Sequence, residues 1–430
     1  MAHWSNWAST ATADDVEIAR PATRDELTAL AAEAIAAGRR IRPLGSGHSF
    51  SAVGEPVDLA VDLSLLDRVV SVDRETGRAT VEGGIKMRHL NEALGAHGLA
   101  LENMGDIDRQ SITGALSTGT HGTGAGFGGL ATQVRAVEIL TGTGEVLRLD
   151  EHDPMLRGAV VSLGALGVIL SVTLQCVPAF RLEAVEAPLP LDEVLSRLDE
   201  FCDETDHFEF YWFPNTDRTL TKRNRRVGDG AAKPPSALHY WWNESFTENI
   251  LFSAANRVGS KWKSKIPAIN GLSTKFLSPR TYTDRSHRVF TSPRKVVFRE
   301  MEYALPRSEA RAAVRELTRW VDRCEEGVSF PLEVRFAGAD GNWLSTAYER
   351  DTVYLAVHQY HRNPHERFFA GAEDVFTSFG GRPHWGKMHT RDAGYLAEQY
   401  PRHPDFLALR DECDPERVFS NAYLEKVLGA

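Results

Sequence analysis

Four clusters of glycine between residues 45 and 167 constrain the folding of this 430-residue chain more than any other feature. Glycine lets a backbone approach a ligand closely and adopt positive φ angles. Successive backbone N–H groups in such turns form concave sites that suit anions such as phosphate. The clusters indicate either a phosphate-binding part or four ordinary turns, and their number favours the first. They are Gly45-Ser46-Gly47, Gly83-Gly84 and the stretches 114–129 and 164–167.

One sequence of the form GxGxxG occurs, at residues 124–129. A dinucleotide fingerprint of this form needs a strand before it and a helix that begins within it. Here more glycine and threonine precede the motif, and residues 134–140 and 145–149 predict a hairpin after it. We therefore do not expect an NAD site of the Rossmann type.

The spacing of apolar residues predicts an α+β fold in two parts that meet near Pro178. Residues 23–26 have the form of a capping box, which predicts that a helix begins there and ends near Gly38. Further elements of the first part are strands at 40–44 and 57–63, a hairpin at 69–72 and 78–81, and a helix at 86–97. The second part is predicted to have helices at 191–202, 306–323 and about 395–400, and strands at 207–213, 295–304, 330–336 and 352–361. Residues 222–295 are the least regular.

Charge and composition exclude several classes of protein. The net charge of -10 argues against a nucleic-acid partner, because phosphate binding depends on Lys and Arg charge. The one basic cluster, residues 221–226, is interpreted as a solvated loop. No apolar run reaches the roughly 18 residues of a membrane helix, and the first residues lack the pattern of a signal peptide. The four cysteines are far apart, which excludes a disulfide scaffold and a zinc finger and is typical of a reducing cytoplasm. We therefore expect a cytoplasmic chain with no membrane segment.

Charged residues of the second part are candidates for chemistry. Glu333 and Arg335 lie two residues apart on a predicted strand and therefore share a face, either as a structural ion pair or as part of a site. Arg382, His384 and Lys387 lie in one turn that could hold an anionic substrate oxygen or a flavin, or that could be solvated.

Histidines give two further hypotheses. His48 and His121 lie within glycine turns, where a histidine is either exposed or able to hydrogen-bond a cofactor or be alkylated by it. Five histidines of the second part could suggest a metal site, but their spacing matches no ligand pattern, so no metal is expected. They are His358, His361, His365, His384 and His389.

Nine motifs extend over nearly the whole chain. They are PLGSGHSF (43–50), VEGG (81–84), GALSTGTHGTG (114–124), SLGALGVI (162–169), TLQCVPAF (173–180), HFEFYWFP (207–214), LEVRF (332–336), GGRPHWGK (380–387) and NAYLEKVL (421–428). The first four resemble the FAD-binding domain of the vanillyl-alcohol-oxidase-type flavoproteins. The other five motifs are similar to one branch of these flavoproteins, the sugar-lactone branch, which comprises the L-gulono-1,4-lactone and D-arabinono-1,4-lactone oxidases or dehydrogenases. Alditol oxidases resemble the chain in the same motifs, except that they have a serine where this chain has Asp106.

The resemblance implies a two-domain flavoprotein. A PCMH-type FAD-binding domain would span residues 1–178, and an α+β substrate or cap domain 179–430, with the segment from about 396 returning to the flavin. It implies that FAD is bound covalently through His48, and that Glu333, Arg335 and Lys387 bind the substrate and act in catalysis. The remaining residues that it assigns to the cofactor are Leu44, Gly45, Ser46, Gly47, Ser49, Gly105, Asp106, Ser111, Gly114, Thr118, Gly119, Thr120, His121 and Ile169.

The function that the resemblance implies is oxidation of a secondary alcohol of an aldono-1,4-lactone by hydride transfer to flavin, which gives an ascorbate-like product. In such proteins a glycine at the position of Gly105 leaves room beside the flavin, which favours O2 as the acceptor. The alternative is that Gly105 only serves a turn. A polyol oxidase, a lactone dehydrogenase with another acceptor and a non-catalytic flavin-binding protein are the alternatives.

Overall fold

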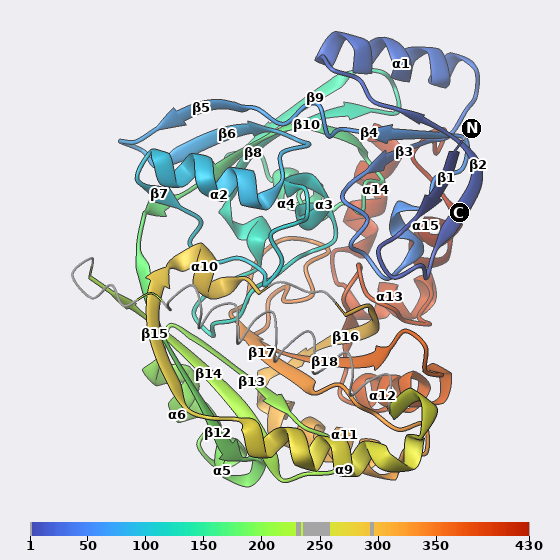
Figure 1. Cartoon of the computed structure of the whole chain (residues 1–430). Helices are drawn as coiled ribbons and strands as arrows, with labels where there is room; N and C mark the ends of the chain where they lie inside the picture. The colour runs from blue at the N-terminus through green and yellow to red at the C-terminus, as the bar shows by residue number, and fades with distance from the viewer. Residues whose placement is uncertain (1, 229–233, 235–258, 293–295, 430) are drawn as a thin grey trace.

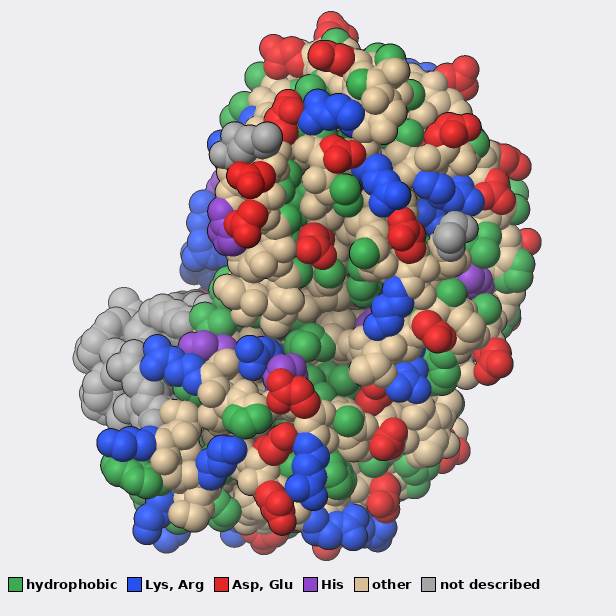
Figure 2. Space-filling model, turned by 90° about the vertical axis from the view of Figure 1, so that its right-hand side faces the viewer, with side chains coloured by type: hydrophobic (Ala, Val, Ile, Leu, Met, Phe, Trp, Pro, Cys, Tyr) green, Lys and Arg blue, Asp and Glu red, His purple; other side chains and the backbone are tan. Residues whose placement is uncertain are grey.

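The described strands form two main sheets and one small two-stranded sheet in the first part of the chain, and a third main sheet, the largest, in the second part (Figure 1). The structure is a computed structural model that describes residues 2–228, 234, 259–292 and 296–429. Within these ranges, no helix has the length and apolar character needed to cross a bilayer. All four cysteines are free thiols. Acidic and basic side chains are interspersed over the face seen in Figure 2.

The first sheet has the strand order β1-β2-β4-β3, and β4 is parallel to both of its neighbours. Helix α1 (Arg24–Ala36) lies between β2 and β3 in sequence and begins as the capping box predicts, because Thr23 Oγ1 accepts a hydrogen bond of 3.1 Å from the N–H of Glu26. Its buried residues pack in one core with β4. The strands are β1 (Ala2–Ser5), β2 (Thr12–Ala19), β3 (Ile41–Leu44) and β4 (Leu59–Asp62).

The second sheet is antiparallel, with the order β5-β6-β10-β8-β9. Both predicted hairpins are confirmed, β5 with β6 and β8 with β9. Residues 124–129 lead through a short 3-10 turn into β8, without an α-helix, which confirms that the GxGxxG sequence is not a Rossmann fingerprint. The elements of this region are β5 (Val69–Asp73), β6 (Arg78–Glu82), α2 (Met87–Ala96), β7 (Leu99–Ala100), α3 (Ile112–Ser117), β8 (Val134–Thr141), β9 (Val146–Asp150), α4 (Leu156–Ala159), β10 (Gly167–Gln175) and β11 (Val177–Pro178).

The third sheet has eight strands in the order β15-β12-β14-β13-β17-β18-β16-β19, and every neighbouring pair is antiparallel. Its strands are β12 (Arg181–Pro190), β13 (His207–Trp212), β14 (Arg218–Val227), β15 (Arg280–Arg285), β16 (Phe298–Pro306), β17 (Leu332–Ala337), β18 (Thr352–Tyr360) and β19 (Arg382–Pro383). The helices among them are α5 (Leu191–Ser196), α6 (Leu198–Glu204), α9 (Ile266–Ser273), α10 (Ser286–Phe290), α11 (Ala310–Arg323) and α12 (Glu366–Ser378).

The two faces of this sheet differ in chemistry, because side chains alternate between faces along each strand. The apolar positions of β13, β16, β17 and β18 pack in one core with α5, α6, α11 and α12. The alternate positions of the same strands carry buried charge on the opposite face. They include Glu209, Glu300, Glu302, Glu333, Arg335 and His358. The sheet therefore presents a row of buried charged groups on the face opposite its helices.

Two predictions of the sequence are wrong. Residues 221–226 are not a solvated loop but part of β14, which lies between β12 and β13 in the sheet. Long basic side chains remain possible there because their stems pack on apolar surface; the guanidinium of Arg226, for example, lies 4.3 Å from the ring centre of Phe180. The single helix expected at 191–202 is two helices, α5 and α6, with a break at Arg197. Of residues 222–295, the stretches 229–233, 235–258 and 293–295 lie outside the described ranges.

The C-terminal helices return to the first part of the chain. Side chains of α13 (Ala393–Gln399), α14 (His403–Cys413) and α15 (Ala422–Leu428) share one core with β6, β8 and β10. Asn421 caps α15 and also donates hydrogen bonds to the backbone oxygens of Ala52 and Glu55, at 3.1 and 2.9 Å. These hydrogen bonds hold the last helix, α15, against the segment that follows β3.

Candidate active site

Two glycine turns are packed against each other, one after β3 and one at the start of α3. A Cβ atom on Gly45 would lie 3.1 Å from Ser111 Oγ, and one on Gly114 would lie 3.0 Å from the same oxygen. Ser111 caps α3 by accepting a hydrogen bond from the N–H of Gly114. Gly47 has a φ of +68°, which glycine adopts without strain. Side chains at these positions would close the space between the turns.

This space is a pocket. Its empty volume, including the part open to solvent, is about 840 Å³. The predicted cofactor residues that line it are Leu44, Gly45, Ser46, Gly47, His48, Ser49, Ser111, Gly114, Thr118 and Ile169. The predicted residues Gly105, Asp106, Gly119, Thr120 and His121 do not line it.

Sequence reasoning missed several lining residues, among them Asn6, Arg42, Gln110 and Thr113. The fourth glycine cluster did point to this place, because Gly164 and Gly167 also line the pocket.

Arg42 gives the pocket a buried positive charge. Its guanidinium donates hydrogen bonds to the backbone oxygens of Leu163, Gly164 and Phe419. Within the described ranges it has no carboxylate partner. Burial, and repulsion by Arg410, lower the pKa of Arg42 to about 9. A buried cation without a counter-charge favours an anionic ligand, so the pocket fits the diphosphate of a dinucleotide cofactor.

His48 lies in the same pocket, with its ring 6.2 Å from that of Trp7. Burial lowers the pKa of His48, and Arg109, Lys387 and Lys86 lower it further. The lowered pKa favours the neutral imidazole, in which one ring nitrogen carries no proton.

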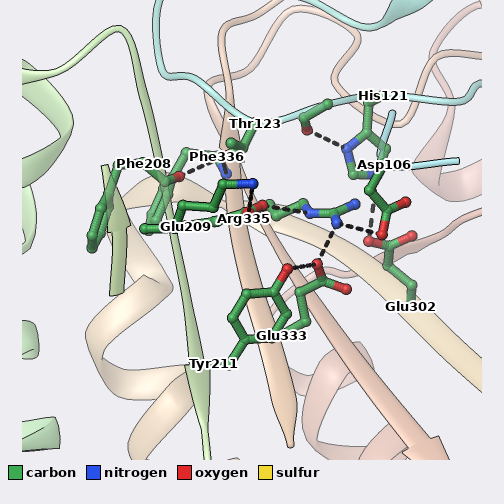
Figure 3. A network of polar contacts seen from close by, with 12 residues as sticks. Asp106, His121, Thr123, Phe208, Glu209, Tyr211, Glu302, Glu333, Arg335 and Phe336 are labelled. Carbon is green, nitrogen blue, oxygen red and sulfur yellow. Dashed lines mark hydrogen bonds and ion pairs between the residues drawn. The ribbon is translucent and has the colours of Figure 1, made fainter. Parts of the chain in front are cut away.

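Arg335 is at the centre of a network of buried carboxylates (Figure 3). Its Nη2 atom forms ion pairs with Glu333 and, at 3.1 Å, with Asp106 Oδ2, and its Nε atom donates to Glu209 Oε2 at 3.1 Å. These carboxylates hold the pKa of Arg335 well above its usual range, although burial alone would lower it. The prediction that Glu333 and Arg335 lie side by side is confirmed.

The partners of Arg335 come from different elements. Glu209 is its register partner on β13, and it lies 3.7 Å from Lys222 Nζ of β14. Tyr211, also on β13, donates a hydrogen bond of 2.9 Å to Glu333. Sequence reasoning singled out neither Glu209 nor Tyr211; the only signal was their alternation with the apolar residues of the strand.

Lys387 is the second cation of the network. Its Nζ atom lies 2.5 Å from Glu300 Oε2. Burial lowers the pKa of Lys387, but Glu300 and Glu302 outweigh this effect and raise it. His358 lies between Glu300 and Glu333, with its Nε2 atom 3.5 and 3.9 Å from their oxygens. A chain of close polar contacts through Glu300, His358 and Glu333 therefore connects Lys387 to Arg335.

The other two basic residues of the Lys387 turn have different surroundings: the N–H of His384 donates to Glu302 O at 3.0 Å, whereas the side chain of Arg382 bonds to backbone oxygens. Arg382 is buried and donates to the backbone oxygens of Gln399, Thr346 and Tyr348. Burial lowers the pKa of His384 to about 3, and its Nδ1 atom accepts a hydrogen bond from the N–H of Gly386. The alternative of a solvated turn is wrong, because Arg382, His384 and Trp385 are all buried.

Among the predicted cofactor residues that do not line the pocket, Asp106 and His121 contact the charged network around Arg335 and Glu302. His121 stacks on Tyr354 with ring centres 3.5 Å apart, and its Nε2 atom lies 3.4 Å from Glu302. Gly105 packs closely, since a Cβ atom there would lie 2.9 Å from Thr120 Cγ2.

Among the residues that the structure describes, two groups have the atom types of a metal site: His121 with Glu302 and His384, and Glu300 with Glu333 and His358. Glu300 and Glu333, however, are ion-paired to Lys387 and Arg335, which are cations that a metal ion would have to displace.

The pocket and the network adjoin each other. The N–H of Phe50 donates to Gly386 O at 2.6 Å, and Ser51 Oγ donates to Trp385 O at 2.8 Å. Lys387 Nζ lies 5.1 Å from the ring centre of Phe50. Backbone hydrogen bonds thus join the turn that carries His48 to the turn that carries Lys387.

Comparisons with known proteins agree with this arrangement. A family model described as an FAD binding domain matches residues 17–150, and one described as D-arabinono-1,4-lactone oxidase matches residues 172–427. An L-gulono-1,4-lactone dehydrogenase of Mycobacterium tuberculosis is 45% identical over 99% of both chains. An L-gulonolactone oxidase of Scyliorhinus torazame is 33% identical over 98% of this chain and 97% of that one. An alditol oxidase of a Streptomyces species is 32% identical over 99% of this chain and 98% of that one.

Among solved structures, a cholesterol oxidase of B. sterolicum has a TM-score of 0.85 at 18% identity and covers 99% of this chain and 96% of that one. This similarity concerns the fold.

The fold and the pocket define an FAD-dependent oxidoreductase with a PCMH-type FAD-binding domain and a second α+β domain. The chain belongs to the D-arabinono-1,4-lactone oxidase family. The resemblance found in the sequence and the α+β flavoprotein fold are thereby confirmed.

Proposed function

We propose that the protein oxidises a secondary alcohol of an aldono-1,4-lactone, such as L-gulono-, L-galactono- or D-arabinono-1,4-lactone. The observation that carries this proposal is the junction of the cofactor pocket with two cations, the buried Arg335 and the half-buried Lys387, through the hydrogen bond from Phe50 to Gly386. The names of the related lactone oxidases and dehydrogenases support the substrate class.

In this proposal residues 1–178 hold the cofactor, residues 179–430 form the substrate domain, and the segment from about 396 returns to the flavin. The pocket residues around Gly45 and Gly114 would bind FAD, with Arg42 near its diphosphate. Gly105, Asp106, Gly119, Thr120 and His121 would contact the side of the flavin that faces the substrate.

FAD would supply the hydride acceptor, to which the carbinol C–H bond of the lactone gives its electron pair. Arg335 and Lys387 would stabilise the negative charge that develops on the carbinol oxygen as its proton leaves. Glu333 would bind a substrate hydroxyl and hold Arg335 in place. The resulting 2-keto lactone can enolise to an ene-diol, which is an ascorbate-like product.

The experiment is anaerobic mixing of the purified holoenzyme with a panel of lactones and alditols, followed at the flavin absorbance. We expect aldono-1,4-lactones to reduce the flavin. Reduction by xylitol or sorbitol but not by lactones would assign a polyol oxidase instead, the function named for the Streptomyces relative. Absence of reduction by any sugar derivative would indicate a non-catalytic flavin protein.

We also propose that FAD is attached covalently to His48. The neutral imidazole in the pocket supports this, because an unprotonated ring nitrogen is the nucleophile that a bond to the flavin methyl group requires. After acid precipitation, flavin should remain with the protein, and a mass spectrum should locate it on the peptide that contains His48. Flavin found entirely in the supernatant would contradict the attachment.

The acceptor is proposed to be O2, which would be reduced to hydrogen peroxide. The resemblance supports this, because in such proteins a glycine at the position of Gly105 leaves room beside the flavin. In this structure a Cβ atom on Gly105 would meet Thr120 Cγ2 at 2.9 Å and His121 O at 3.2 Å, so Gly105→Ala has to displace protein atoms there. The reduced enzyme should reoxidise quickly in air-saturated buffer, and Gly105→Ala should slow this step. Slow reoxidation of the parent, with fast transfer to a dye or a cytochrome, would assign a dehydrogenase.

A further inference from the structure

One surface segment, residues 260–277, combines exposed apolar and basic side chains. Six large hydrophobic side chains of the described ranges are exposed, and three of them lie in this segment: Trp262 at 52%, Leu272 at 55% and Phe276 at 79%. The same segment contains four of the ten lysines of the chain, Lys261, Lys263, Lys265 and Lys275. An exposed apolar cluster of this kind marks an interaction surface more often than scattered single residues do.

The fold explains why these side chains point outward. Helix α9 is anchored by Ile266, which is fully buried, and by Asn270, whose amide donates to the backbone oxygens of Pro214 and Val328 at 3.1 and 2.9 Å. The helical path continues through a 3-10 turn, Thr274–Phe276. Leu272 and Phe276 are four residues apart and therefore lie on the same side, away from the anchor. The helix lies at the lower edge of the molecule, far from α1 (Figure 1).

Among the described residues, none of the four lysines of the segment forms an ion pair with a carboxylate, whereas Lys222 and Lys387 do. The sequence has no Asp or Glu between Glu248 and Asp284, although the chain as a whole carries a net charge of -10. Two acidic residues directly precede Gly327, which packs against Ile266, but both have other partners. Glu325 pairs with Arg367 at 3.0 Å, and Glu326 accepts a hydrogen bond of 2.6 Å from the N–H of Phe368.

We propose that residues 260–277 bind the surface of membranes that contain anionic lipids. Three of the four lysines lie in or beside the 3-10 turn Lys263–Lys265, Leu272 lies in α9, and Phe276 ends the 3-10 turn that follows. A helical segment with lysines beside exposed Trp, Leu and Phe is typical of segments that lie in the interface plane of a bilayer. The ring centre of Trp262 lies 4.9 Å from the ammonium of Lys261. Tryptophan is enriched at the level of the lipid headgroups. The lysines are attracted to the negative surface potential, and the apolar side chains enter the acyl boundary. The positive segment complements such a surface while the rest of this acidic chain does not.

The test is co-sedimentation of the holoenzyme with vesicles of phosphatidylcholine, with and without phosphatidylglycerol. We expect binding to the vesicles with phosphatidylglycerol, and weaker binding at higher salt. The double variant Lys263→Gln/Lys265→Gln should bind roughly 25-fold more weakly, at about fivefold per lysine. Phe276→Ser should weaken binding roughly tenfold or more.

Matched controls come from the first part of the chain. Leu65 and Val70 are exposed to 52% and 56%, so Leu65→Ser and Val70→Ser remove a similar apolar area elsewhere and should leave vesicle binding unchanged. Flavin content and unfolding temperature show whether each variant is folded. Turnover with the lactone should be unaffected in all of them. The membrane proposal and the proposed function can therefore fail separately.

Three outcomes would overturn the proposal. The first is that the holoenzyme does not bind anionic vesicles at low salt. The second is that it binds them equally after the lysine and Phe276 substitutions. The third is that the holoenzyme does not bind the vesicles but uses this segment to bind an acidic polypeptide or a second copy of itself. Self-association would appear as a rise in mass with protein concentration.

Discussion

At the scale of single residues, Arg335 has two roles that substitutions can separate. It is proposed to stabilise the substrate oxygen, and it also neutralises Asp106, Glu209 and Glu333. Arg335→Lys keeps a charge among the carboxylates but loses the planar fork of donors. We expect kcat to fall roughly 100- to 1000-fold while the flavin spectrum and the unfolding temperature change little.

Arg335→Met is the contrasting variant, because it leaves buried carboxylates without their cation. It should lose about 3–5 kcal/mol of unfolding free energy in addition to activity. Lys387→Met should likewise lower kcat roughly 100- to 1000-fold. Near-native kcat in Arg335→Lys and Lys387→Met with bound FAD would contradict the assignment of the site.

Glu300 predicts a pH dependence of stability. Burial raises its pKa, but Lys387 and His358 outweigh burial and lower the pKa to about 2. A carboxyl whose pKa is lower in the folded state stabilises the fold above its unfolded pKa, and this contribution is lost as the pH falls toward the folded pKa. The difference in unfolding free energy between the parent and Glu300→Gln should therefore be largest at neutral pH and shrink below about pH 4.5.

Glu55 is a control of opposite sign, since burial raises its pKa. Its ionisation opposes folding, so Glu55→Gln should become relatively more stabilising as the pH rises through the range in which Glu55 ionises. Denaturant unfolding at several pH values measures both variants. A Glu300→Gln difference that stays constant down to about pH 3 would contradict the ion pair with Lys387.

At the scale of elements, the contact between the turn after β3 and α3 depends on glycine. A Cβ atom on Gly114 would lie 3.0 Å from Ser111 Oγ and 3.5 Å from the Cα atom of Gly45. Gly114→Ala should overpack this contact at a cost of about 1–3 kcal/mol and reduce the flavin content of the purified protein. Gly95→Ala, within α2 and with open space around it, should instead stabilise the protein by about 0.5–1 kcal/mol with full flavin content. Equal flavin content in both variants would show that the two turns do not form the cofactor pocket.

At the scale of the whole molecule, Asn421 ties the last helix to the first part of the chain. It caps α15, and its amide donates to the backbone oxygens of Ala52 and Glu55. Asn421→Ala should cost about 2–4 kcal/mol, since it removes a cap together with the hydrogen bonds of the amide to these backbone oxygens. Asp392 caps α13, and its side chain accepts from the N–H of Tyr395. Asp392→Ala should therefore cost only about 1 kcal/mol. Thermal unfolding that gave equal losses for the two variants would contradict the role of Asn421 as a tie.

The sequence by itself determined those features that depend on neighbours along the chain. The capping box at Thr23, the two hairpins and the shared face of Glu333 and Arg335 follow from periods of 3.6 and 2 residues and from turn chemistry, and all are present in the structure. The glycine clusters likewise indicated a pocket, because close backbone approach and positive φ require glycine wherever the turns meet.

Only the tertiary structure decided which charges meet. Arg335 pairs with Glu209 because β13 and β17 are neighbours in the sheet although more than a hundred residues separate them, and Lys387 meets Glu300 from a turn beyond β19. From the sequence alone, residues 221–226 are only a basic stretch, whereas the strand order places them in an inner strand of the sheet, between β12 and β13. Periodicity assigns a side chain to a face, but the order of strands in a sheet, which local sequence does not encode, determines what that face contacts.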